Sequence, residues 1–247
     1  MSQVFDLAND AQLASDLARQ AGTLLLKARD LTSITGKPLG ALGDAVGQQF
    51  LSHSLQSLRP NDAVLSEEAT DDVARLERSR VWIIDPLDGT REYSEGRDDW
   101  AVHVALCVDG EPVVGAVALP ALDLVLDTST PPKMPHAPDG LKILVSRSRP
   151  PEVASRAAEV LGGELVGMGS AGAKTMAVVR GEAHAYVHAG GQYEWDSAAP
   201  VAVALAAGFH VSRLDGSPLT YNHRDTYMPD LVVCRPELKD RLMAAVG

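Results

Sequence analysis

The sequence has only two cysteines and no long hydrophobic run, and each absence excludes a class of protein. Cys107 and Cys234 lie in apolar segments without a CxxC partner, so we expect buried free thiols rather than a disulfide framework. No apolar run approaches the roughly 20 residues that cross a bilayer, and the polar start MSQVFDLANDAQ is unlike a secretory signal. These absences predict a cytoplasmic protein with no membrane partner.

Aromatic residues and positive charge are also scarce. Aromatic side chains make up 4% of the chain and its net charge is −11. A nucleic-acid polymer or an anionic membrane is therefore an unfavourable partner, because both attract basic surfaces and the former also uses stacking rings. An acidic protein can still bind a phosphate group when cations lie in the site. For such a ligand, the acidic composition points to metal ions as the cations.

The chain is rich in alternating helix and strand signals. We expect helices over residues 10–30, 44–58, 151–161, 170–180 and 196–207, and strands over 63–65, 81–84, 100–108, 112–119, 122–127, 142–146 and 183–188. Asp109-Gly110 predicts a hairpin. Gly36, Gly40 and Gly43 predict a break before the second helix, and the four prolines of 128–140 predict a loop.

Helices that alternate with both single strands and hairpins indicate a mixed α/β fold in layers, without simple βαβ repetition. The length of 247 residues allows one large domain or two packed halves. We predict an N-terminal half over residues 1–140 and a C-terminal half over 141–247, which together form one functional unit.

Acidic residues follow the ends of two predicted strands. Glu67 comes after Ala63–Ser66, and Asp85 and Asp88 come after Val81–Ile84. Strand ends offer rigid, solvent-facing positions for ligands. Two carboxylates on one tight turn repel each other unless a cation lies between them, and hard oxygen ligands suit Mg²⁺. The spacing therefore predicts a magnesium site, with a turn capped by aspartates as the alternative.

Three further residues fit a phosphate site. Gly89 allows the backbone to approach an anion, and free N–H groups at a helix start bind phosphate. Thr90 adds a hydroxyl that could orient water. Asp196 opens a predicted helix, where a cap is the simpler role; one carboxylate oxygen could cap the helix while the other faces a metal ion.

Three segments together resemble the signatures of the inositol monophosphatase superfamily. They are Ser66-Glu67-Glu68, Trp82–Thr90 and Glu194–Pro200. Gly169-Ser170-Ala171 and the turn at 214–219 extend the resemblance over nearly the whole chain. The resemblance implies a layered αβαβα sandwich, a magnesium-dependent phosphatase acting on a small phosphate ester, sensitivity to lithium, and a homodimer as the assembly.

The resemblance also implies roles for individual residues. Glu67, Asp85 and the Leu87 carbonyl would bind a first Mg²⁺, Asp85, Asp88 and Asp196 a second, and Glu67 would extend to a third. Thr90 and Asp44 would orient and deprotonate the attacking water, with Asp85 as an aspartyl nucleophile the rival mechanism. The substrate would contact Leu87, Asp88, Gly89, Thr90, Arg91, Gly169, Ser170 and Asp196.

Asp44 departs from the family pattern. The family usually shows Pro-Val-Thr-x-x-Asp, whereas Pro38–Asp44 lacks the threonine and is one residue longer. A simple helix cap is therefore the alternative role for Asp44.

The residues after Thr90 bear on the substrate. Arg91-Glu92-Tyr93 resembles the CysQ-type 3′(2′),5′-bisphosphate nucleotidases more than the inositol monophosphatases, which have DGT-x-Asn-Phe. Arg91 could meet a second phosphate as a bidentate donor, or be an ordinary solvated charge; Lys174 and Arg147 are weaker candidates. The resemblance favours adenosine 3′,5′-bisphosphate, an intermediate of sulfate assimilation. Inositol 1-phosphate and fructose 1,6-bisphosphate are alternatives, and a non-catalytic nucleotide or metal sensor is a more distant one.

Overall fold

Two five-stranded mixed sheets carry the fold of residues 6–247, which the computed structural model describes. The first sheet has the order β1-β2-β3-β4-β5, in which β1 and β2 are parallel and the other neighbours are antiparallel. Its strands are β1 (Ala63–Ser66), β2 (Arg80–Asp88), β3 (Ala101–Val108), β4 (Glu111–Leu119) and β5 (Leu124–Asp127). The Asp109-Gly110 hairpin and the strand at the end of this series are thus confirmed.

The second sheet has the order β7-β6-β8-β10-β9. Its strands are β6 (Lys142–Ser146), β7 (Glu164–Met168), β8 (Ala185–Tyr193), β9 (His210–Ser212) and β10 (Tyr227–Cys234). β6 runs parallel to both β7 and β8, and β10 is antiparallel to β8 and β9. The sequence predicted β6 and the first part of β8, residues 185–188, but not the other three strands.

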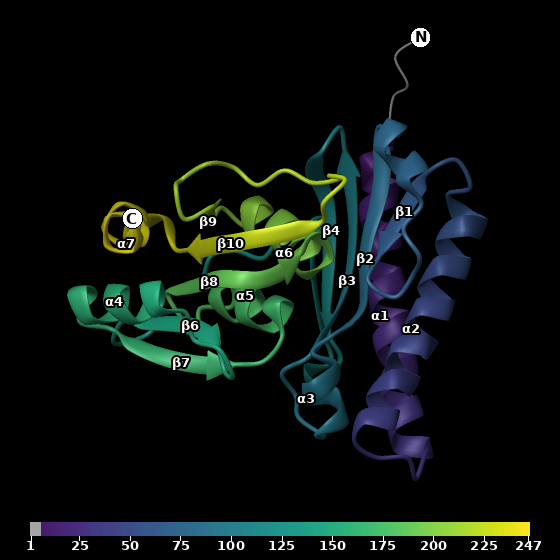
Figure 1. The fold of residues 1–247 in the computed structure, drawn as a ribbon, viewed down its shortest axis with the longest axis horizontal. Coiled ribbons are helices and arrows are strands. Elements are labelled where there is room, and N and C mark those ends of the chain that lie inside the picture. The colour runs from purple at the N-terminus through teal and green to yellow at the C-terminus, as the bar shows by residue number, and fades with distance from the viewer. Residues whose placement is uncertain (1–5) are drawn as a thin grey trace.

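Helices cover both sheets and fill the space between them (Figure 1). The helices are α1 (Leu7–Leu31), α2 (Lys37–Leu58), α3 (Thr90–Ser94), α4 (Glu152–Leu161), α5 (Ala171–Val179), α6 (Glu194–Ala206) and α7 (Lys239–Val246), with short 3₁₀ turns at Val73–Glu77, Pro120–Leu122 and Pro236–Leu238. α1 and α2 pack on the first sheet, α5 and α6 lie between the sheets, and α4 and α7 cover the second sheet. The predicted αβαβα layering is confirmed.

Three apolar cores separate the layers, and β2 contributes to two of them. Val81 and Ile83 face the central core, whereas Trp82 and Ile84 face α1 and α2. A strand covered on both faces is expected to be apolar throughout, which explains the unbroken run before Asp85. Within residues 6–247, no helix is both long and apolar enough to span a membrane. Both cysteines are buried and free, as predicted.

The expected break before α2 is wrong. The helix begins at Lys37 rather than Asp44 and contains Gly40, Gly43 and Gly47. Glycine lowers helix propensity, but here it allows close packing: a Cβ on Gly43 would lie 2.7 Å from Leu87 Cδ2, and one on Gly47 would lie 2.9 Å from the Pro86 oxygen. The backbone of α2 therefore rests directly on the Asp85–Thr90 segment.

Two other details differ from expectation. The Asp85–Asp88 segment is the irregular end of β2, with a shift in its pairing to β3, rather than a separate tight turn. Helix α6 begins at Glu194, so Asp196 is its third residue. The predicted loop over 128–140 is confirmed. The division into halves at residue 140 stays a prediction.

Candidate active site

Four carboxylates from three elements meet at one end of the first sheet. Glu67 directly follows β1, Asp85 and Asp88 end the adjacent strand β2, and Asp196 lies in the first turn of α6. Their charges act on one another. Although Glu67 keeps an exposed surface, partial desolvation and then the charges of Asp196 and Asp88 raise its pKa to about 7. The structure therefore brings together the acidic residues that the sequence placed far apart.

Burial has the same effect on two of the aspartates. Burial and then the charges of Glu67 and Asp88 raise the pKa of Asp85 well above its usual range. Burial and then the Asp88 charge raise the pKa of Asp196 to about 7. Carboxylates in this state are costly to ionise without a cation between them.

Among residues 6–247, each of the three aspartates uses one oxygen for hydrogen bonds to the protein and keeps the other free. Asp85 Oδ1 accepts the Leu87 N–H at 3.0 Å, while its Oδ2 is buried without a hydrogen-bond partner among the described residues. Asp196 Oδ2 accepts the Tyr193 N–H at 2.7 Å and so caps α6. A buried, unpaired carboxylate oxygen is rare unless a ligand completes it. The donor set therefore fits a divalent cation that prefers oxygen ligands.

Asp88 is held more tightly than the other two aspartates. Its Oδ2 accepts hydrogen bonds from Ser170 Oγ at 2.5 Å and from the Gly172 N–H at 2.7 Å, and lies 3.2 Å from His103 Nε2. Burial opposes ionisation of Asp88, but these contacts outweigh it and lower the pKa. Asp88 is therefore the carboxylate that stays charged, with Oδ1 left for a ligand.

Sequence reasoning missed His103, which lies opposite Asp85 on β3 and is fully buried. Its Nδ1 donates to the Trp195 carbonyl at 3.0 Å and its Nε2 faces Asp88. The ring thus connects the end of β2 to the start of α6, which carries Asp196. A Cβ on Gly172 would lie 2.0 Å from His103 Nε2, so glycine is needed there. The available signal was one polar residue in the apolar strand Ala101–Val108.

Asp44 meets Thr90 beside this cluster. Thr90 Oγ1 lies 3.0 Å from Asp44 Oδ1 and 3.2 Å from the Leu87 carbonyl, so its proton can go to either oxygen. Burial raises the pKa of Asp44 to about 6, although the Thr90 hydrogen bond opposes the shift. The N-cap residue of α2 is Gly36, and Asp44 lies well inside the helix. The alternative role of Asp44 as a helix cap is therefore wrong.

Comparison with known proteins accounts for this arrangement. The sequence profile of the inositol monophosphatase family matches residues 6–247. The chain belongs to this family. A protein of Mycobacterium bovis named 3′-phosphoadenosine 5′-phosphate phosphatase is 54% identical over 92% of this chain and 89% of its own length. The 3′(2′),5′-bisphosphate nucleotidase CysQ of Escherichia coli K12 is 31% identical over 86% of this chain and 94% of its own length.

The fold agrees with the family. The crystal structure of CysQ from Bacteroides thetaiotaomicron, a bacterial member of the inositol monophosphatase family, has a TM-score of 0.80 at 25% identity and covers 93% of this chain and 98% of its own. The resemblance drawn from the three sequence segments is thereby confirmed. Proteins of this family are generally metal-dependent, in keeping with the acidic cluster.

The remaining residues that family membership implicates have protein partners here. The Gly169 N–H donates to Asp99 Oδ2 at 2.7 Å, and a Cβ on Gly169 would lie 2.3 Å from Glu92 Cγ. Ser170 has φ 51° and holds Asp88. Gly89, at φ 94°, precedes α3 and packs against Trp100 and Ser170. Contacts from these residues to a substrate stay predictions.

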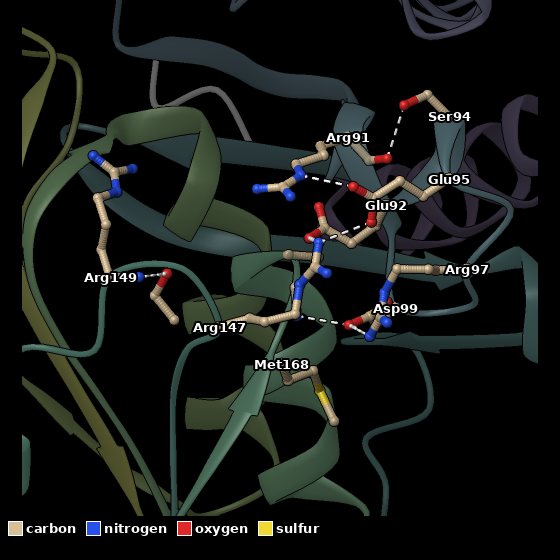
Figure 2. Close-up of polar contacts among 12 residues, drawn as sticks. Arg91, Glu92, Ser94, Glu95, Arg97, Asp99, Arg147, Arg149 and Met168 are labelled. Atoms are coloured by element: carbon tan, nitrogen blue, oxygen red, sulfur yellow. Dashed lines mark hydrogen bonds and ion pairs between the residues drawn. The ribbon is translucent and has the colours of Figure 1, made fainter. Parts of the chain in front are cut away.

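Basic residues near α3 are mostly neutralised (Figure 2). Ion pairs join Arg91 to Glu95, Arg147 to Glu92 and Glu95, and Arg97 to Asp99. The side chain of Arg91 is 64% exposed and its Nε lies 2.8 Å from Glu95 Oε1. Lys174 is buried and donates to the carbonyls of Ser170 and Met168. A role for Arg91 in substrate binding therefore requires Arg91 to share or give up its ion pair.

The acidic cluster predicts a pH-dependent stabilisation by divalent cations. Glu67 and Asp196, with pKa values raised to about 7, keep their protons in the folded state at pH values where the unfolded chain has lost them. The metal-free fold is therefore favoured at low pH and loses this advantage as the pH rises to about 7. We expect Mg²⁺ to raise the thermal midpoint little at about pH 5.5 and strongly at about pH 8, because the ion replaces the protons. Equal shifts at both pH values, measured by differential scanning fluorimetry, would contradict this.

His103 should control metal affinity. Replacing His103 by Leu removes the contacts to both Asp88 and Trp195, and the loss of such a supporting partner typically weakens metal binding about 10–100-fold. His103→Gln, which keeps a donor toward Asp88, should lose less. Calorimetric titration with Mn²⁺ measures the change, and the metal-free melting curve controls for folding. An unchanged Mn²⁺ affinity in a folded Leu variant would exclude this role.

Proposed function

We propose that this protein is a Mg²⁺-dependent phosphatase that hydrolyses the 3′-phosphate of adenosine 3′,5′-bisphosphate to give AMP and phosphate, in the cytoplasm and as part of sulfate assimilation. The names of relatives 50–54% identical to the chain support the substrate. The main structural support for a metal-dependent enzyme is Asp85 Oδ2, which is buried without a hydrogen-bond partner among the described residues and lies within a cluster of four carboxylates. A homodimer in solution is part of the proposal, and analytical ultracentrifugation tests it.

The residues present fit Mg²⁺. Glu67, Asp85, Asp88, Asp196 and the Leu87 carbonyl would hold two or three ions between them. When bound, Mg²⁺ lowers the pKa of water and neutralises charge on the phosphoryl oxygens. Ser170, Gly172 and His103 keep Asp88 oriented toward that space. The backbone N–H groups of Gly89 and Thr90 would position the phosphate.

Asp44 and Thr90 supply the proton acceptor. When Thr90 donates its proton to Asp44, the lone pairs of its Oγ1 can accept a hydrogen bond from water and aim it at phosphorus. Asp44, with a pKa raised to about 6, is ionised at neutral pH and can take the water's proton. The water oxygen forms a bond to phosphorus as the bond from phosphorus to the 3′ oxygen breaks, and the leaving oxygen takes a proton from solvent.

The direct experiment compares substrates on one preparation. We expect kcat/KM for adenosine 3′,5′-bisphosphate to exceed that for inositol 1-phosphate and for fructose 1,6-bisphosphate by at least about tenfold. A higher value for either sugar phosphate would overturn the substrate assignment. A single turnover in ¹⁸O-labelled water should place the label in phosphate; its absence there would favour Asp85 as a nucleophile.

A further inference from the structure

Among the arginines near α3, Arg149 differs in its charge balance. Figure 2 shows Arg149 apart from the network of Arg91, Arg97 and Arg147, each of which binds a carboxylate. Within residues 6–247, the Arg149 guanidinium has no acidic partner and no hydrogen bond; only its backbone N–H donates, to Ser146 Oγ at 3.2 Å. This exposed cation is therefore available to an anion from outside the chain.

Arg149 is held over the segment that leads to Asp196. A Cβ on Gly191 would lie 3.3 Å from Arg149 Nη1 and 3.7 Å from Nη2, so the guanidinium lies against the glycine backbone. Gly191 belongs to β8, which runs without a break into α6. The guanidinium thus lies next to the strand that positions a proposed metal ligand, on an exposed stretch of backbone.

Three buried side chains of β8, those of Tyr186, His188 and Gln192, form what we call the buried wall, and two of them have polar atoms without partners within residues 6–247. Tyr186 and His188 share one face of β8, and Gln192, which lies beyond the pairing irregularity at Gly190 and Gly191, contacts Tyr186 through its side chain. Among the described residues, His188 Nε2 and Gln192 Oε1 are buried without a hydrogen-bond partner. Gln192 Nε2 donates to the Tyr186 hydroxyl, and reversing the amide would still leave one of its atoms free. Two buried polar atoms of β8 without partners indicate a site that a polar ligand completes.

A second cation lies behind this wall. Lys174 is 5% exposed, and its Nζ donates to the carbonyls of Met168 and Ser170 and lies 5.1 Å from the centre of the Tyr186 ring. Burial, then the charge of Lys174 and, more weakly, that of Arg149 lower the pKa of His188 to about 4, so both cations act at the same place. The nearby Asp230 already binds Arg213 at 2.8 Å.

Near α3, by contrast with Arg149, the arginines Arg91, Arg97 and Arg147 are paired with acidic residues. In the network drawn in Figure 2, each of them pairs with a carboxylate, from Glu92, Glu95 or Asp99. A dianionic phosphate bound by Arg91 would approach Glu95, whose charge repels it. Among residues 6–247, neither Arg149 nor Lys174 forms an ion pair with a carboxylate, and a guanidinium can bind phosphate with two parallel hydrogen bonds.

We propose that Arg149 binds the second phosphate of the bisphosphorylated nucleotide, in a subsite whose buried wall is formed by Tyr186, His188 and Gln192, with Lys174 behind it. This inference rests on the proposed function and names the residue that distinguishes a bisphosphate from a monophosphate. His188 Nε2 and the free amide atom of Gln192 offer hydrogen bonds to the nucleoside between the two phosphates. Lys174 contributes charge from behind the wall.

The test compares two substrates that differ only in the second phosphate. Arg149→Ala should raise KM for adenosine 3′,5′-bisphosphate about 10–100-fold and leave kcat/KM for adenosine 3′-monophosphate within about twofold. Arg149→Lys should raise KM less than Arg149→Ala does, because lysine keeps the positive charge but lacks the two parallel N–H donors of the guanidinium. Arg156→Ala, an exposed arginine on α4, is the matched control and should change neither substrate.

The outcomes separate the inference from the proposed function. Equal losses on both nucleotides, no loss on either, or a bisphosphate-selective loss in Arg91→Ala instead would overturn the assignment to Arg149. If the wild-type protein hydrolyses neither nucleotide, the proposed function fails first. Arg149 is exposed and has no side-chain partner among the described residues, so its replacement should not disturb folding, and a melting curve checks this.

Discussion

Replacing Asp85 by Asn should abolish phosphate hydrolysis and at the same time make the metal-free protein more stable. Asp85 is fully buried with a free Oδ2, and burial together with the charge of Glu67 raises its pKa. Asn keeps the oxygen that accepts the Leu87 N–H, removes the repelled charge, and offers an amide N–H to its acidic neighbours. Each kcal/mol of repulsion removed should raise the thermal midpoint by about 2–4 °C in a protein of this size.

The loss of activity should be large, because a metal ligand contributes several kcal/mol to stabilising the transition state. That range corresponds to a fall in kcat/KM of at least about 10³-fold. Steady-state kinetics and melting curves without metal give the two measurements. Asp127→Asn is a matched control: the oxygens of Asp127 are satisfied by Ser15, Ser129 and Thr130, so this variant should lose stability and keep activity. If Asp85→Asn behaved in the same way, Asp85 would not be part of the site.

Replacing Asp44 by Asn should lower kcat by about 10²–10⁴-fold, which is the usual contribution of a general base. Asp44 lies 3.0 Å from Thr90 and has its pKa raised by burial to about 6. In the wild type, kcat should therefore rise with pH through about 6 as this carboxyl loses its proton, and the Asn variant should lack that rise.

Metal binding separates this role from that of the ligands. Asp44→Asn should bind Mn²⁺ with nearly unchanged affinity in a calorimetric titration, whereas Asp85→Asn should not. Thr90→Val, which removes the hydroxyl between Asp44 and the Leu87 carbonyl, should reproduce the effect on kcat. A weakened Mn²⁺ affinity in Asp44→Asn would place Asp44 among the metal ligands instead.

Local sequence signals were sufficient for much of the fold. The β3–β4 hairpin follows from Asp109-Gly110, where both residues have positive φ as a primed turn requires. The apolar run before Asp85 became a strand covered on both faces. β10 was missed because Pro229 and a pairing irregularity interrupt its pattern. The start of α2 was misplaced because propensity counts glycine against a helix, while packing decided its position.

The candidate site was less accessible to sequence reasoning. The carboxylates could be identified because each follows a strand or opens a helix, and the family resemblance placed them together. The contacts of His103 could not, because they join a lone polar side chain in an apolar strand to Trp195, 92 positions away in the chain, and to Asp88, whose other partner Ser170 is 82 positions from it. The motif drew attention to Arg91 rather than to Glu95, which binds its guanidinium from four residues further along the chain. Only the tertiary structure shows that the Arg149 guanidinium has no acidic partner among residues 6–247.

The close contact between α2 and the Asp85–Thr90 segment has a consequence for mutational scans. At Gly40, Gly43 and Gly47 the helix has no side chain where it touches Thr90, Leu87 and Pro86, and the same helix carries Asp44. We expect a single added methyl group to move Asp44, the proposed proton acceptor, away from the Thr90 hydroxyl, although every reactive atom would still be present. Substitutions at these three glycines should therefore lower activity as substitutions of the acidic residues do, because the glycines set the distance between Asp44 and Thr90.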